Sequence, residues 1–214
     1  MGAMLAIDTS AGTTVALVRN GVVLAESNHD SNMGHAETVA VAIAEVLAAA
    51  PGVGVNSVVV GRGPAPFTGL RVGIAAAMMF SEGAKAQLSG VISLDAIALL
   101  ELQENQNVSA ANPLLVITDA RRKEVYYALY SGLNSHGVPI RIDGPAVIKP
   151  AALEEMLIDK NITPITSTKA ITAVAIANLA EAQLRDATLS RDVTALYLRQ
   201  PDAVEGQFGK KVSG

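Results

Sequence analysis

The chain has 214 residues, a length that suits two small lobes better than one compact domain. Half of the residues are hydrophobic but only 3% are aromatic, so we expect a core built from Ala, Val, Leu and Ile. The absence of cysteine excludes disulfides, thiolate zinc sites and cysteine nucleophiles, and a net charge of -4 argues against a stand-alone nucleic-acid-binding domain.

The first half of the chain predicts three strands, a helix, a strand and a helix, followed by a short strand and a linking helix. Asn20-Gly21 is a strong hairpin signal between the second and third strands, and Pro51 ends the first helix. The expected elements are strands 4–10, 14–20 and 21–28, helix 35–50, strand 57–61, helix 70–85, strand 88–93 and helix 94–103.

The second half repeats the opening pattern after a polar stretch at 105–113. An apolar strand again ends in a Thr-Asp pair and a second strand returns, so Asp8 and Asp119 hold equivalent places. We expect strands within 114–132 and at 138–148, helix 150–158, a strand at 162–166, helix 169–186 and an extended tail at 194–202 that crosses back onto the body.

These elements predict an α/β fold of two β-β-β-α-β-α lobes, 1–107 and 108–214, of which the second is abbreviated. The duplicated pattern resembles the actin, hexokinase and Hsp70 superfamily, in which nucleotide lies between the lobes and acidic strand-end residues organise metal and phosphate. No run approaches the ~20 uncharged residues of a membrane-spanning helix. No signal-like N-terminus is recognised either. We therefore expect a cytoplasmic chain without membrane contact.

Two polar regions could contact an anion. The turn at 8–14 could hold phosphate through backbone N–H groups and hydroxyls, or its polar side chains could simply satisfy a tight hairpin. Arg62 and Arg71 flank the helix start, where Thr68 is the expected N-cap, and could meet an anion or bridge to acidic residues of the fold. The candidate weak contacts are Asp8, Thr9, Ser10, Gly12, Arg62, Arg71 and Asp119.

Signatures of catalysis are missing from the sequence. GRGPAPFTGLRVG at 61–73 is not a P-loop, because no Lys follows Gly69, and no G-x-S-x-G nucleophile elbow occurs. No two of the three histidines lie within four residues of each other, so helical metal-binding pairs are absent. We therefore expect no catalytic residues and no metal site in this chain.

The helix after this stretch is apolar nearly all round, so both of its sides should be covered. Gly69, Gly73 and Ala77 form a bare stripe along which another helix could pass closely. The cover could be the first helix, another protein, or the chain itself. For a partner or dimer interface, the expected residues are His35, Thr38, Val39, Ala42, Gly69, Leu70, Gly73, Ile74, Ala77, Met78 and Ser81. We expect Ile74→Glu or Ala77→Arg to abolish pairing while leaving the fold intact.

Four segments in this order, MLAIDTS, GRGPAPFTGLRVGIA, VITDARRKEVYYALY and LYLRQPD, resemble the bacterial TsaB (YeaZ) family. The resemblance covers essentially the whole chain and implies a subunit of the machinery that makes threonylcarbamoyladenosine in tRNA. It further implies pairing with the catalytic TsaD subunit through first-lobe helices, a TsaE ATPase that joins them, and a homodimer through the same surface when alone. ATP or ADP and metal would then be held by the partner subunits, and tRNA would be reached only through the complex.

One position separates this chain from TsaD-type enzymes. They carry a metal-binding H-x-x-x-H after the strand that corresponds to SGVIS, where this chain has Ser93-Leu94-Asp95-Ala96-Ile97. Ser and Ile cannot replace two imidazole ligands, so the resemblance implies a non-catalytic subunit. The alternative is an enzyme, either an ATP-dependent phosphotransferase or a metallopeptidase of the kind suggested by the older glycoprotease label. The loop also departs from its family at Ala65-Pro66, where Gly-Ser or Gly-Pro is usual.

Overall fold

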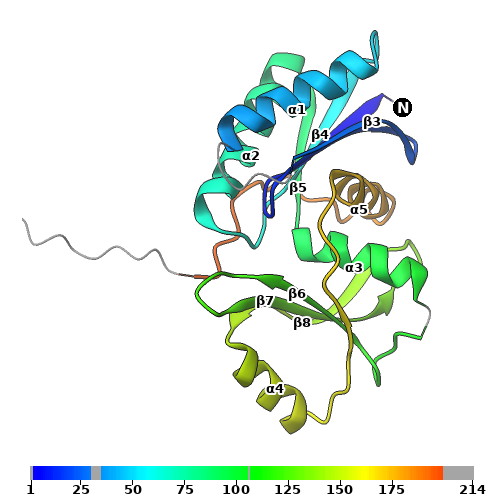
Figure 1. The fold of residues 1–214 in the computed structure, drawn as a ribbon. Helices are drawn as coiled ribbons and strands as arrows, with labels where there is room; N and C mark the ends of the chain where they lie inside the picture. Colours follow the sequence, from blue (N-terminus) through cyan, green and yellow to red (C-terminus); the bar gives the residue numbers. More distant parts are fainter. Residues whose placement is uncertain (1, 30–34, 106, 200–214) are drawn as a thin grey trace, which may run out of the picture.

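The computed structural model describes residues 2–29, 35–105 and 107–199, and for 35–37 and 67 the backbone alone. These residues form two lobes, each built on one mixed β-sheet (Figure 1). The α/β fold with duplicated β-β-β-α-β-α topology is confirmed, because three antiparallel strands, a helix, a parallel strand and a further helix follow each other in both halves.

The first lobe contains a sheet in the order β3-β2-β1-β4-β5. Its strands are β1 (Ala3–Asp8), β2 (Thr13–Arg19), β3 (Val22–His29), β4 (Val55–Gly61) and β5 (Gln87–Val91). Side chains alternate between the two faces, as a strand requires. Leu5 and Ile7 face helices α1 (His35–Ala49) and α2 (Phe67–Ala84), whereas Met4 and Ala6 belong to the core on the opposite face.

The second lobe contains a four-stranded sheet in the order β8-β7-β6-β9, one strand fewer among the described residues than in the first lobe. Its strands are β6 (Leu114–Asp119), β7 (Val125–Leu133), β8 (Pro139–Ile148) and β9 (Ile165–Ser167). Helix α4 (Pro150–Asp159) covers one face through Leu153, which packs with Leu115, Tyr127 and Leu129. Within the described residues, the sheet of this lobe is thus smaller than that of the first, and its last strand, β9, has three residues.

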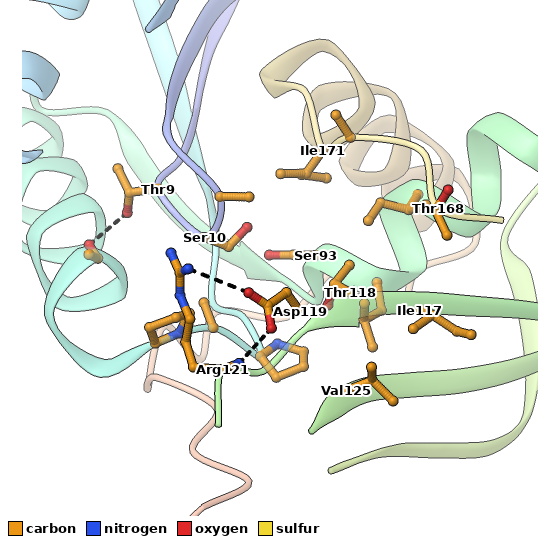
Figure 2. A pocket seen from close by; sticks show the side chains of 18 of the residues that line it. Thr9, Ser10, Ser93, Ile117, Thr118, Asp119, Arg121, Val125, Thr168 and Ile171 are labelled. Carbon is orange, nitrogen blue, oxygen red and sulfur yellow. Dashed lines mark hydrogen bonds and ion pairs between the residues drawn. The ribbon is translucent and has the colours of Figure 1, made fainter. Parts of the chain in front are cut away.

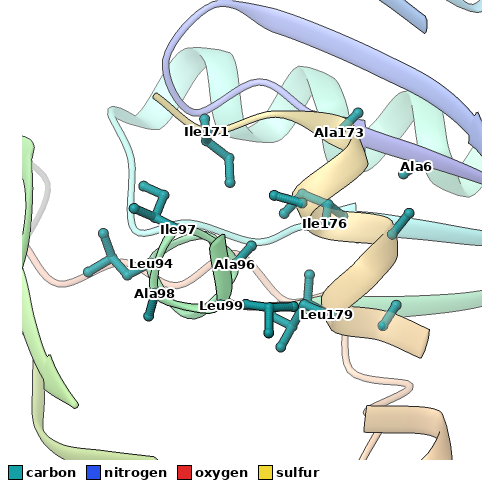
Figure 3. Close-up of a cluster of buried hydrophobic side chains, with 14 of the residues drawn as sticks. Ala6, Leu94, Ala96, Ile97, Ala98, Leu99, Ile171, Ala173, Ile176 and Leu179 are labelled. Carbon is teal, nitrogen blue, oxygen red and sulfur yellow. The ribbon is translucent and has the colours of Figure 1, made fainter. Parts of the chain in front are cut away.

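Helices α3 (Ser93–Glu104) and α5 (Ala173–Arg185) lie between the two sheets and join the lobes. Figure 3 shows Leu94, Ile97 and Leu99 of α3 in one cluster with Ile176 and Leu179 of α5. All five side chains are buried. Helix α5, which the sequence assigns to the second lobe, packs against β1 and β2 of the first lobe as well as against α3.

Two helix starts differ from the expected ones. Helix α2 begins at Phe67 with Pro66 at the N-cap and no capping side chain, so the expectation that Thr68 is the N-cap is wrong. Helix α5 begins at Ala173 rather than near 169, because the Thr172 hydroxyl accepts a hydrogen bond from the Ala175 N–H and ends the preceding extended segment.

Candidate functional site

A cavity of about 1170 Å³ lies between the lobes (Figure 2). Its walls are contributed by the β1–β2 turn, the 64–72 segment, the start of α3, the end of β6 with the following turn, and residues 168–171. Most of the lining is apolar, for example Val72, Ile97 and Ile117, with hydroxyls such as those of Ser10 and Thr168 set among them. The arrangement can accept an amphipathic small molecule.

Asp8, the last residue of β1, is fully buried and turned away from this cavity. Its Oδ1 accepts hydrogen bonds from the Ser10 N–H (2.7 Å) and hydroxyl (2.5 Å), and its Oδ2 accepts one from the Ser93 hydroxyl (2.7 Å). Burial raises the pKa of Asp8, and the bonds from Ser10 and Ser93 act in the opposite direction. Asp8 therefore shapes the turn, which corrects the expectation that it contacts an anion.

The close packing around Asp8 also explains the glycine at position 61. A Cβ at Gly61 would lie 1.8 Å from the Asp8 Oδ2, so the end of β4 has to be glycine. Gly12 has a φ of 120° and lines a second, smaller cavity of about 150 Å³ beside Asp8 rather than the large one. Of the residues predicted in the 8–14 turn, Thr9 and Ser10 reach the large cavity.

Asp119 ends β6 as Asp8 ends β1, but it is exposed and lines the large cavity. It accepts a hydrogen bond from the Arg121 N–H (2.8 Å) and forms an ion pair with the Arg121 guanidinium (3.5 Å). Figure 2 shows the Arg121 guanidinium joined to the Asp119 carboxylate by this ion pair. The two equivalent carboxylates thus have different roles, one structural and buried, the other at the surface of the cavity.

Arg62 and Arg71 are engaged by a C-terminal segment, residues 189–199, which we call the strap. Arg62 donates to the carbonyl of Asp192 (3.1 Å) and pairs with its carboxylate, and the Leu196 N–H donates to the Arg62 carbonyl (2.8 Å). Arg71 donates to the Tyr197 hydroxyl (2.6 Å) and its guanidinium lies 5.3 Å from the centre of that ring. Arg62 thus bridges to an acidic residue of the fold, one of the two alternatives, whereas Arg71 contacts a tyrosine and its part in anion binding stays a prediction.

The strap runs along the edge of the first sheet before it reaches these arginines. Ser190 forms an antiparallel bridge with Gly90, whose N–H donates to the Ser190 carbonyl (3.0 Å). A Cβ at Gly90 would lie 2.3 Å from the Asp192 carbonyl oxygen, so the close approach of the strap requires glycine there. The expected return of the tail onto the body is confirmed for 194–199, and 200–202 lie outside the described residues.

The residues predicted for an interface divide into buried and exposed ones. Six are buried within the chain and face the first sheet or the neighbouring helix: Val39, Ala42, Leu70, Ile74, Ala77 and Ser81. Gly69 and Gly73 lie against Thr9, so the expectation of a bare stripe open to another helix is wrong. Met78 is 50% exposed and Thr38 is half-buried, while the side chain of His35 lies outside the described residues.

Two further apolar residues of these helices are exposed and were not singled out from the sequence. Met79 is 77% exposed and Val41 is 50% exposed. We call these two residues and Met78 the α1–α2 face, after the two helices that carry them and that cover the outer side of the first sheet (Figure 1). Because nearly every position of α2 is apolar, periodicity could not tell its outer residues from its inner ones.

The start of α3 faces the large cavity with Ser93, Leu94 and Ile97, the positions at which the sequence lacks the H-x-x-x-H pair. Asp95 points to the second sheet instead, where it accepts a hydrogen bond from the Tyr130 hydroxyl (2.7 Å) and pairs with Arg141 (2.9 Å). Burial raises the pKa of Asp95, and Arg141 opposes this shift. Within the described residues, no three His, Asp or Glu side chains converge as a metal site.

Comparisons with known proteins agree with this architecture. The family model described as TsaD, tRNA N6-adenosine threonylcarbamoyltransferase, matches residues 23–197. An uncharacterized protein of Mycobacterium leprae is 38% identical over 163 residues, which cover 72% of this chain and 41% of that protein. The Escherichia coli tRNA threonylcarbamoyladenosine biosynthesis protein TsaB is 34% identical over 103 residues, 48% of this chain and 42% of that one. The chain thus spans less than half of either relative.

A solved structure shares the fold. YeaZ from Pseudomonas aeruginosa superimposes with a TM-score of 0.72 at 23% identity, and the match covers 92% of this chain and 100% of that one. Two sheets separated by helices are therefore common to both chains. No helix in the described part of the sequence combines the length and apolarity that crossing a bilayer demands.

Proposed function

Because the chain belongs to the TsaD family by its match over 23–197, and within it to the TsaB (YeaZ) branch, we propose that it acts in the biosynthesis of threonylcarbamoyladenosine in tRNA. In this proposal it is a non-catalytic subunit that binds and stabilises a TsaD-like catalytic subunit. A TsaE-like ATPase joins the pair, and the chain alone forms a homodimer. The complex works in the cytoplasm.

The observation that carries the proposal is the chemistry at the start of α3. Ser93 and Ile97 occupy the cavity wall at the two positions where TsaD-type enzymes have histidines. The Ser93 hydroxyl is committed to the Asp8 carboxylate, and Ile97 is 1% exposed and has no donor atom. A metal ion needs converging donors, and these side chains supply none. We therefore expect ATP, ADP and metal to be held by the partner subunits.

The α1–α2 face supports the pairing part of the proposal. Val41, Met78 and Met79 expose apolar side chains on the two helices that cover the first sheet, and in this proposal another protein covers them. The buried residues of the same helices, such as Leu70 and Ala77, form the rigid layer beneath it. Both the TsaD-like subunit and a second copy of the chain would use this face.

Reconstitution tests the function. The chain, the TsaD-like subunit and the TsaE-like ATPase of the same organism are combined with ATP, tRNA and the threonylcarbamoyl donor, and modified adenosine is measured by mass spectrometry. We expect no product from the chain alone, and a large loss of product when the chain is left out of the complete mixture. Product formation or ATP turnover by the chain alone would instead support the enzyme alternative.

A further inference from the structure

We propose that the turn between β6 and β7, together with the adjoining end of the strap, carries a contact surface for the phosphate backbone of RNA. The surface, which we call the basic patch, consists of five cationic side chains and one aromatic ring: Arg71, Arg121, Arg122, Lys123, Tyr197 and Arg199. That the RNA is tRNA rests on the proposed function. A direct contact goes beyond the expectation that tRNA is reached only through the partner subunits.

The turn between β6 and β7 supplies three of the cations. Arg121, Arg122 and Lys123 are all exposed and all have left-handed backbones, with φ of 63°, 53° and 60°. Two hydrogen bonds of 3.0 Å, from the Ala120 N–H to the Glu124 carbonyl and from the Glu124 N–H to the Arg121 carbonyl, close the turn. The backbone of this turn thus holds three consecutive cationic residues at the surface.

The strap brings the other cations to this turn. Arg199 pairs with the carboxylate of Glu124, directly after the turn, and Tyr197 accepts the hydrogen bond from Arg71 of α2. Tyr197 and Arg199 are two residues apart on the strap, and two residues of extended chain span only about 7 Å. Because Tyr197 contacts Arg71 and Arg199 contacts the turn, both groups lie within reach of one extended ligand. Arg121 and Val72, the neighbour of Arg71, both line the interlobe cavity.

The turn carries three consecutive cations, Arg121, Arg122 and Lys123, although the chain as a whole has a net charge of -4. The Arg71 guanidinium lies over the ring of Tyr197, which is 39% exposed. Stacked arginine and tyrosine side chains are a surface on which unpaired bases of RNA stack. Positive charge next to such a surface favours RNA over an acidic protein as the ligand.

The test compares two full-length variants with the same change of charge. One is Arg121→Gln, Arg122→Gln, Lys123→Gln, which removes the charges of the turn. The control is Lys85→Gln, Lys149→Gln, Arg185→Gln, which removes three exposed cations elsewhere on the molecule. Binding of a fluorescent tRNA transcript is measured by anisotropy from 50 to 200 mM salt, for each chain alone and with the TsaD-like subunit. Co-elution with that subunit and thermal unfolding are recorded separately.

We expect the turn variant to bind tRNA more weakly, with a slope of log affinity against log salt that is smaller by about two to three, and the control to behave like the wild type. Both variants should still pair with the TsaD-like subunit. Equal tRNA binding by the turn variant and the wild type would overturn the inference, as would equal losses in both variants or the absence of any tRNA binding. Loss of pairing by the turn variant alone would identify a protein contact instead. Failure of the wild-type chain to pair would count against the proposed function, whatever the tRNA result.

Discussion

Thr9 lies directly against Gly73. The Thr9 hydroxyl donates a hydrogen bond to the carbonyl of Gly69, one helical turn before Gly73 (2.8 Å). A Cβ on Gly73 would lie 2.2 Å from the hydroxyl oxygen of Thr9. The residue that follows β1 is thereby locked against the first turns of α2. The glycines of this helix serve close packing inside the first lobe, whereas Met78 and Met79 of the same helix are exposed and belong to the surface that we propose for pairing.

Gly73→Ala should destabilise the protein. The added methyl group would also lie 3.0 Å from the Thr9 Cγ2 and 3.1 Å from its Cβ, so the side chain cannot rotate away without cost. We expect the free energy of unfolding to fall by about 1–3 kcal/mol, as for other overpacked cores. Gly83→Ala in the same helix is the matched control, because no atom lies within 4 Å of its added Cβ. It should be neutral or more stable by up to about 1 kcal/mol in denaturant unfolding.

Arg141→Met should leave Asp95 buried without its ionic partner. Breaking a buried pair on one side costs about 3–5 kcal/mol, and we expect the lower end because Arg141 is 29% exposed. Burial already raises the pKa of Asp95, and removal of Arg141 raises it further. A raised pKa means that the folded state prefers the protonated carboxyl group, so the variant loses stability as the pH rises through the pKa of Asp95 in the folded state. The difference from the wild type should therefore shrink at acidic pH.

Denaturant unfolding at a series of pH values measures this effect. The double variant Asp95→Leu, Arg141→Met removes both charges and should recover most of the loss. A single Arg141→Met variant as stable as the wild type at neutral pH would show that the pair does not hold α3 to the second sheet.

Asp192→Asn should loosen the strap in a pH-dependent manner. Hydrogen bonds from Thr194 and from Arg62 lower the pKa of Asp192 from 3.8 to about 2. The lowered pKa means that the folded state prefers the carboxylate, so this stabilisation is complete above about pH 4 and is lost as the pH falls towards 2. The melting temperature of the variant should lie below that of the wild type at neutral pH. The two values should converge near pH 2, and a gap that persists there would contradict the assignment.

Much of the fold could be predicted from the sequence, because alternating apolar residues, a hairpin turn and helix-ending Pro and Gly residues act locally. Helix α1 was expected at 35–50 and is found at 35–49, and both strand-end carboxylates were placed correctly. Asp8 and Asp119 look alike in sequence, yet one is buried by Gly61 and Ser93, which come from distant segments. Their different roles follow from tertiary packing, which no local pattern records.

The orientation of α2 was beyond local patterns for the same reason. Ile74 and Ala77 were expected to tolerate charged substitutions, but they are 8% and 0% exposed, so Ile74→Glu and Ala77→Arg would put charge into the core and unfold the lobe. An apolar helix has no polar face to mark its outer side. Likewise, nothing near Arg62 or Arg71 in sequence predicted that their partners lie more than 120 residues away, on the strap.

The affinity of the TsaD-like subunit for two matched variants tests the central claim most directly. Met79→Glu alters the α1–α2 face, and Ile158→Glu puts the same charge on α4 of the second lobe, at a residue that is 76% exposed compared with 77% for Met79. Titration calorimetry should show binding weakened at least about tenfold by Met79→Glu and unchanged by Ile158→Glu, with both variants folded. Wild-type affinity in the Met79→Glu variant would contradict the account.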